Sequence, residues 1–156
     1  DANNALDGDG PFSPERTGTL PMSDIIHLCF SSGMKEDELL RLISARGGLL
    51  AHLGTNDMRM IVKQIEEGDK HAELIVSAMI WNVAKAIAAE GAVLCGKIDA
   101  VLLTGGLCYS DYIVNLLKKR IEFLAPVVVY PGQDEMLALT ENAIAALSGQ
   151  REVFEY

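Results

Sequence analysis

Two adjacent glycines stand where an apolar segment gives way to a predicted helix. Gly105 and Gly106 follow residues 99–104, "DAVLLT", and precede residues 110–120, whose apolar side chains recur at helical spacing. In α/β proteins ligands bind at the carboxyl ends of strands, where backbone N–H groups can receive phosphate or the sugar of a nucleotide. Because glycine has no Cβ, a flat base or ribose can lie against such a backbone. The same glycines would also make a tight turn without a ligand, since the sequence is neither GxGxxG nor a Walker loop.

A single arginine lies in a loop rich in glycine and proline. The first 21 residues contain two Asp-Gly pairs, three prolines and a Thr-Gly step, which predict a short strand followed by an ordered loop around Arg16. A guanidinium in such a loop can offer a planar fork of donors to a phosphoryl group, although an ordinary surface ion pair would use it equally well. A calcium-binding EF-hand is excluded, because the twelfth residue counted from Asp7 is Gly18, where that loop requires glutamate.

Carboxylates stand at the predicted starts of two further helices. In "TNDMR" the helix dipole favours Asp57 and disfavours Arg59, so the arginine could be retained for a ligand or for another domain. In "PGQDEM" Asp134 and Glu135 follow the second apolar segment, and paired carboxylates there can hold hydrated magnesium. Simple compensation of the helix dipole would explain both acidic positions as well. The three histidines have no metal-ligand spacing around them and are interpreted as structural.

The elements that must position these residues change character near residue 95. Helical spacing of apolar residues predicts helices before it, and two continuous apolar runs predict strands after it. The expected helices are 23–32 with Ser23 as its cap, 35–46, 57–68 with Thr55 or Asn56 as its cap, and the long helix 69–94. Residues 48–57 are expected to form a loop, and strands are expected within 99–106 and 125–132, each followed by a helix.

The order strand, helix, strand, helix predicts the fold class α/β. Continuous apolar strands separated by a helix are typical of a parallel sheet that is reached through a right-handed crossover and covered by helices on both faces. Only two strong strands are present, so the sheet is expected to be incomplete and to need strands from before residue 1.

Composition limits the classes of partner and compartment. At 156 residues the chain is expected to form one domain, and its formal charge of −9 opposes binding to nucleic acid or to anionic membranes. The apolar window 76–96 contains Lys85 and Glu90, so it is interpreted as a buried helix and no membrane span is expected. Three cysteines without ligand spacing predict free thiols in a reducing cytoplasm. Asp1 is expected to be a cut end.

Four segments together carry a resemblance to a known family. The segments "DANNALDGDGPFSPERTGTLP", "GGLLAHLGTNDMR", "VLLTGGLCYS" and "APVVVYPGQDEMLAL", in this order, resemble the C-terminal half of the butyrate kinases, within the acetate kinase family and the actin, sugar kinase and Hsp70 ATPase superfamily. The resemblance implies ribonuclease H-like (actin-like ATPase) domains that close over a cleft. It also implies phosphoryl transfer between ATP and a short-chain fatty acid, with Mg2+, giving an acyl phosphate and ADP.

The resemblance implies roles for the positions singled out above. Arg16 would steady the transferring phosphoryl group, and Asp134 or Glu135 would lie near magnesium. Two segments would hold the nucleotide, namely Asp57, Met58 and Arg59 at the adenine pocket and Gly105, Gly106, Leu107 and Cys108 at the glycine turn. The turn "GGLCYS" differs from the acetate kinase pattern "GGIGEN", and Asp-Glu stands where that branch has Glu-Glu. Which of the two carboxylates serves is therefore left open.

The resemblance also has consequences for the whole chain. Residues 1–156 would be the C-terminal nucleotide-binding domain of a two-domain kinase whose N-terminal domain is absent from this chain. Such a fragment is expected to be inactive alone, because phosphoryl transfer needs groups that converge from both sides. A small-molecule carboxylate and a nucleotide are the expected partners, in a homodimer or higher homo-oligomer. The alternative is a non-catalytic scaffold or oligomerisation module whose glycines only make turns.

Overall fold

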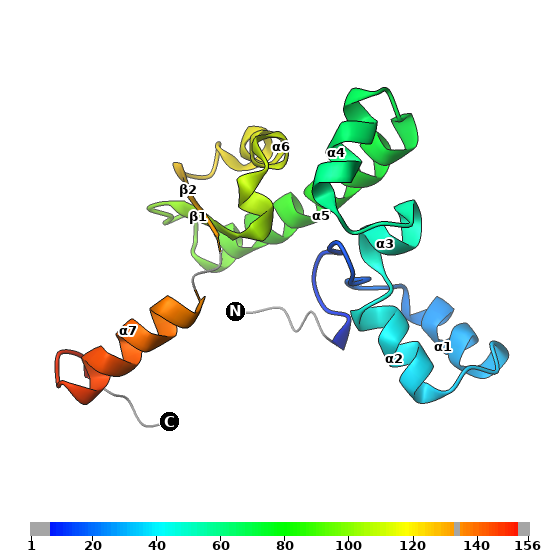
Figure 1. The fold of residues 1–156 in the computed structure, drawn as a ribbon, viewed down its shortest axis with the longest axis horizontal. Coiled ribbons are helices and arrows are strands. Elements are labelled where there is room, and N and C mark those ends of the chain that lie inside the picture. Colours follow the sequence, from blue (N-terminus) through cyan, green and yellow to red (C-terminus); the bar gives the residue numbers. More distant parts are fainter. Residues whose placement is uncertain (1–6, 133–134, 153–156) are drawn as a thin grey trace.

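The computed structural model describes residues 7–132 and 135–152 (Figure 1). The elements follow in the order α1 (Met22–Ser31), α2 (Glu36–Ser44), α3 (Gly48–Leu53), α4 (Met58–Glu66), α5 (Lys70–Val93), β1 (Val101–Gly105), the 3-10 helix η2 (Gly106–Tyr109), α6 (Asp111–Ile121), β2 (Val127–Pro131) and α7 (Glu135–Leu147). The predicted long helix and the predicted order strand, helix, strand, helix are confirmed.

In the described residues the sheet consists of two parallel strands joined through α6. The strands are in register from Val101 opposite Val127 to Gly105 opposite Pro131. Their side chains alternate between two faces. The predicted parallel pairing is therefore confirmed, and the carboxyl ends of both strands lie at one edge.

Helices cover one face of this sheet in the described part of the chain. Leu103, 8% exposed, lies in the core with residues of α5 and α6. Leu102 and Tyr130 lie on the other face and are 63% and 60% exposed, while α7 extends away from the sheet (Figure 1). The expected cover on both faces is thus seen on one face only. Strands that are apolar on both faces belong to sheets with two covered faces, so the open face lacks a layer that its sequence is suited to contact.

α5 is the centre of the core. Its Val76 and Met79 are 0% and 2% exposed, and they lie in one cluster with Leu49 of α3, Ile61 of α4 and Ile121 of α6. Three helices from different parts of the chain are therefore held against one rod by apolar packing, which is the main favourable term in folding.

The two sides of α5 differ in environment. By length and composition alone, α5 is the one helix in the described ranges that could cross a membrane. Val76 and Met79 nevertheless pack in the core, as they do in the core helix of a globular domain. On the opposite side Leu74 is 64% exposed and Trp81 56% exposed. The guanidinium of Arg120 lies 4.7 Å from the centre of the Trp81 ring, within cation–π distance.

The predicted cap of the first helix and the predicted loop at residues 48–57 are wrong. Ser23 does not cap the first helix, because α1 begins with Met22 directly after Pro21. Residues 48–53 form α3, where a loop was expected. The backbone N–H of Leu49 donates to the carbonyl oxygen of Ser13 at 3.1 Å, and the Leu49 side chain is fully buried. A tertiary contact with the glycine-rich loop therefore stabilises a helix too short to be predicted from spacing.

α4 is capped by Asp57, where Thr55 or Asn56 had been expected. Asp57 Oδ1 accepts hydrogen bonds from the backbone N–H and from Nε of Arg59 at 3.0 and 3.1 Å, and Oδ2 accepts from Nη2 at 2.8 Å. Thr55 Oγ1 instead accepts from the backbone N–H of Asp57 at 3.2 Å. The side-chain hydrogen bonds from Arg59, followed by its backbone hydrogen bond, lower the pKa of Asp57 to about 2.

Replacing Asp57 with Asn is expected to reduce the acid sensitivity of the fold. The pKa of Asp57 is about 2 in the folded chain and 3.8 ordinarily, so its ionised form stabilises the fold above the higher value and this contribution is lost as the pH falls through the lower one. In urea denaturation the free energy of unfolding should therefore fall more steeply from about pH 4 to about pH 2 in the wild type than in Asp57→Asn.

The control for this comparison is Asp99→Asn, which removes one exposed negative charge outside the helices. It is expected to keep the steep pH dependence of the wild type. Equal slopes for the wild type and Asp57→Asn would contradict the stabilising role assigned to the Asp57 cap.

Candidate functional site

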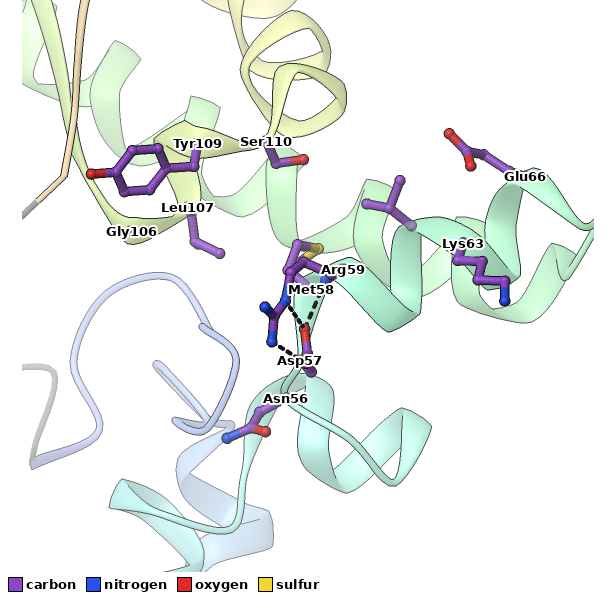
Figure 2. Close-up of a pocket in the computed structure, with 11 residues that line it drawn as sticks. Asn56, Asp57, Met58, Arg59, Lys63, Glu66, Gly106, Leu107, Tyr109 and Ser110 are labelled. Atoms are coloured by element: carbon purple, nitrogen blue, oxygen red, sulfur yellow. Dashed lines mark hydrogen bonds and ion pairs between the residues drawn. The ribbon is translucent and has the colours of Figure 1, made fainter.

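A cavity of about 680 Å³ lies between α4 and the turn that follows β1 (Figure 2). Two segments separated by about forty residues of sequence form its walls, and both are held on α5 by the core packing described above. A volume of this size falls in the range of small-molecule and cofactor sites. The lining residues are Asn56, Asp57, Met58, Arg59, Val62, Lys63, Glu66, Gly106, Leu107, Tyr109 and Ser110.

Asp57 and Arg59 form the polar part of the α4 wall. The fork of hydrogen bonds between their side chains fixes the guanidinium plane, while 90% of the Arg59 side chain stays exposed. Proximity to the Asp57 carboxylate raises the pKa of Arg59 above its ordinary value. The predicted conflict between Arg59 and the helix dipole is thus offset by a local ion pair. Met58, by contrast, is 8% exposed and gives the wall an apolar surface beneath the polar pair.

Gly106 forms the opposite wall. Gly105 has a φ of +94° and pairs with Gly132 through two backbone hydrogen bonds of 3.0 and 3.3 Å, which ends the strand and redirects the chain into η2. A Cβ added to Gly106 would meet no atom within 4 Å. The backbone of Gly106 therefore faces open space that belongs to the cavity, as a nucleoside lying flat against it would require.

Gly105 and Cys108 do not line this cavity. Gly105 is the last residue of β1, and its positive φ is a conformation that side chains rarely adopt. Cys108 donates its S–H to the carbonyl oxygen of Thr104 at 3.1 Å and lines a second cavity with Leu103 and Ile113. Burial raises the pKa of its thiol. Both residues shape the turn, and nucleotide contact at these two positions stays a prediction.

Arg16 lies in a loop tied to this cavity and is not among its lining residues. The loop turns tightly, since Ser13 N–H donates to the carbonyl oxygen of Arg16 at 3.1 Å and Arg16 N–H donates to Ser13 Oγ at 3.2 Å. The side-chain amide of Asn56 donates to the carboxylate of Glu15. The residue before Arg16 is thus bound to the residue before Asp57, so the loop approaches the capped end of α4.

The predicted magnesium ligands cannot be placed together. Asp134 lies outside the described residues, and so does the side chain of Glu135, the first residue of α7. Among the residues that the structure does describe, no group of three histidine, cysteine or acidic side chains is arranged to hold a metal ion. The assignment of magnesium to Asp134 or Glu135 therefore stays a prediction.

The sequence did not lead us to predict the far part of the α4 wall. Val62, Lys63 and Glu66 extend it along α4. Counted from Arg59, these residues stand at positions +3, +4 and +7, which is the spacing of one helix face. The signal was therefore present once the start of α4 was known. Tyr109 and Ser110, which also line the cavity, follow the glycine turn directly, and Ser110 Oγ caps α6 by accepting from Ile113 N–H at 3.4 Å.

Comparison with known sequences gives consistent matches. Residues 10–130 match the Acetokinase family. A probable butyrate kinase of Bacteroides thetaiotaomicron is 62% identical over 156 residues, which is 100% of this chain and 44% of that protein. Butyrate kinase 2 of Clostridium acetobutylicum is 47% identical over the same 156 residues, again 44% of its own length. The chain thus spans less than half the length of the curated relatives it matches.

Solved structures share the fold. An acetate kinase of Porphyromonas gingivalis matches with a TM-score of 0.75 at 20% identity, over 87% of this chain and 41% of that one. A propionate kinase of Francisella tularensis matches with a TM-score of 0.72 at 22% identity, over 83% of this chain and 39% of that one. The expected fold class, α/β of the actin-like ATPase type, is confirmed. With a family match over residues 10–130, the chain belongs to the Acetokinase family.

Proposed function

We propose that the cavity between α4 and η2 binds ATP and ADP, and that residues 1–156 are the C-terminal nucleotide-binding domain of a two-domain kinase. The observation that carries this proposal is the bare backbone of Gly106, which faces the Asp57–Arg59 pair across a cavity of about 680 Å³. An apolar slot with a few fixed polar groups is the usual form of a nucleotide or cofactor site. Met58 and Leu107 would contact the flat faces of the base.

The reaction proposed for the whole protein is that of a butyrate kinase, in which butyrate and ATP give butyryl phosphate and ADP. A carboxylate oxygen of the acid forms a bond to the γ-phosphorus while the bond from that phosphorus to the ADP oxygen breaks. Magnesium held near Asp134 or Glu135 would neutralise phosphate charge. Arg16 would stabilise the negative charge on the transferring group from the loop tied to Asn56.

The chain alone is proposed to be inactive. Phosphoryl transfer depends on cations and positioning groups around the transferred phosphoryl group, and the homologous kinases have more than half of their length outside the region matched here. Experiments on activity therefore use the full-length protein. Three free cysteines, Cys29, Cys95 and Cys108, are in keeping with the proposed location in a reducing cytoplasm.

Gly106→Trp is expected to abolish ADP binding, because an indole would occupy the space in front of the turn. Gly106→Ala should weaken ADP binding by less than Gly106→Trp, since its smaller Cβ meets no protein atom within 4 Å and keeps the fold but stands where the nucleoside would lie. Both variants are compared by calorimetry with ADP and magnesium, after circular dichroism has shown that they fold. ADP binding by Gly106→Trp at wild-type strength would contradict the proposed site. A folded wild type that binds no ADP would favour the alternative, a non-catalytic scaffold.

Arg16→Ala is expected to lower turnover by at least about tenfold, because a charge that stabilises the transferring phosphoryl group is lost. Affinity for ADP should change little, since Arg16 does not line the cavity. Arg41→Ala is the control, as Arg41 is an exposed arginine 3.9 Å from Asp37 on α2. Steady-state rates of acyl phosphate formation measure the effect. A loss of turnover smaller than about tenfold for Arg16→Ala, or an equal loss of turnover in Arg16→Ala and Arg41→Ala, would contradict the role of Arg16.

We further propose that the full-length protein forms a homodimer through the exposed side of α5. Trp81 of α5 and Phe123, which follows α6, are 56% and 76% exposed and line a shallow hollow of about 270 Å³. Trp81→Glu should shift the sedimentation coefficient to that of a monomer. Phe30→Glu, which changes an aromatic residue 88% exposed on α1, should leave it unchanged. An unchanged sedimentation coefficient for Trp81→Glu would contradict pairing through α5.

A further inference from the structure

The cavity extends well beyond the residues that the family resemblance assigned to the nucleotide. Asp57, at the start of α4, and Glu66, at its end, are nine residues apart, which is about 13 Å along a helix. Figure 2 shows Gly106 and Tyr109 toward one end of the drawn set and Lys63 and Glu66 toward the other. The far end of the cavity, defined here as Lys63 and Glu66, therefore has no role in the function proposed above.

The positions of the loop and of α4 decide which part of a nucleotide would reach this far end. This step rests on the proposed function. The loop that carries Arg16 is bound to Asn56 through Glu15, so the phosphates would lie toward the capped end of α4. A nucleoside between Met58 and Leu107 would then point its base edge along α4, toward Lys63 and Glu66.

Glu66 is available to a ligand. It is exposed and forms no hydrogen bond or ion pair with any other residue in the described ranges. An ionised carboxylate is only an acceptor of hydrogen bonds. It matches an amino group on a base edge and is mismatched to a keto oxygen at the same place.

Lys63 supplies the complementary group. Its Nζ lies 3.8 Å from Glu67 Oε1, a distance too long for a hydrogen bond, and the side chain is exposed. An ammonium group is only a donor. Lys63 stands three positions before Glu66 on α4, so the two side chains can reach one ligand. An ammonium matches a ring nitrogen with a free lone pair, and a carboxylate matches the amino group next to it, which is the pattern of adenine.

We propose that Glu66 accepts a hydrogen bond from the 6-amino group of adenine and that Lys63 donates to an adjacent ring nitrogen. The two side chains are specificity-determining residues at the base edge. Because each is solvent-exposed, the discrimination they provide is modest, about tenfold for one hydrogen bond to a charged group.

The test is a cycle that removes the two partners of one hydrogen bond separately. ADP is compared with purine riboside 5′-diphosphate, which has hydrogen in place of the 6-amino group, in calorimetric titrations of the full-length protein with magnesium. The wild type should bind ADP about tenfold more tightly than the analogue. Glu66→Ala should bring this ratio close to one, and Glu67→Ala, the neighbouring carboxylate that does not line the cavity, should leave it at the wild-type value.

Lys63→Met has a different expected signature. It should weaken the binding of both nucleotides by a similar factor, because the ring nitrogens are present in both. A change confined to ADP would overturn the contact assigned to Lys63.

The outcomes separate this inference from the proposed function. The same ratio of affinities in the wild type and in Glu66→Ala, with ADP bound by both, would overturn the role of Glu66 and leave the nucleotide site standing. A folded wild type that binds neither nucleotide would overturn both.

Discussion

Apolar packing of three helices on α5 is the constraint on which the cavity depends. Ile61 of α4 and Ile121 of α6 are both 0% exposed, and both lie in the cluster centred on Val76 and Met79. The two walls of the cavity belong to segments that are far apart in the sequence. The distance between the walls is therefore set by α5, on which both segments pack. The cavity stays open only if its walls are held apart. The close-packed core beneath them holds them apart, because such a core resists compression.

The glycine turn shows how a strand end becomes a binding surface. Gly105 accepts the left-handed backbone that side chains avoid, and its two hydrogen bonds to Gly132 hold the turn to the end of β2. Gly106 can then leave its backbone bare toward the cavity. The division of work explains why both glycines are needed although only Gly106 lines the cavity. Gly105 provides the backbone conformation of the turn, and Gly106 leaves space for a ligand.

Much of this architecture could be predicted from the sequence, and the failures have physical causes. α5 follows from the helical spacing of its apolar residues, and the two strands follow from continuous apolar runs too short for a helix. α3 could not be predicted in this way, since its stability comes from contacts of Leu49 with a distant loop. Likewise Thr55 and Asp57 are both residue types that cap helices. Only the hydrogen bond from the Arg59 N–H to Asp57 shows that Asp57 is the cap. Spacing places Lys63 and Glu66 on the same helix face as Arg59, but it does not show that this face lines a cavity, because that depends on how α4 lies against η2.

The position of Trp81 has a practical consequence. It is the one tryptophan of the chain, it lies 56% exposed on α5, and Arg120 covers its ring. Indole emission responds to the polarity and charge around the ring, so the tryptophan emission of this chain reports on this single surface. Any event that excludes solvent from that side of α5 would shift the emission spectrum, without a label and without interference from a second fluorophore of the same kind.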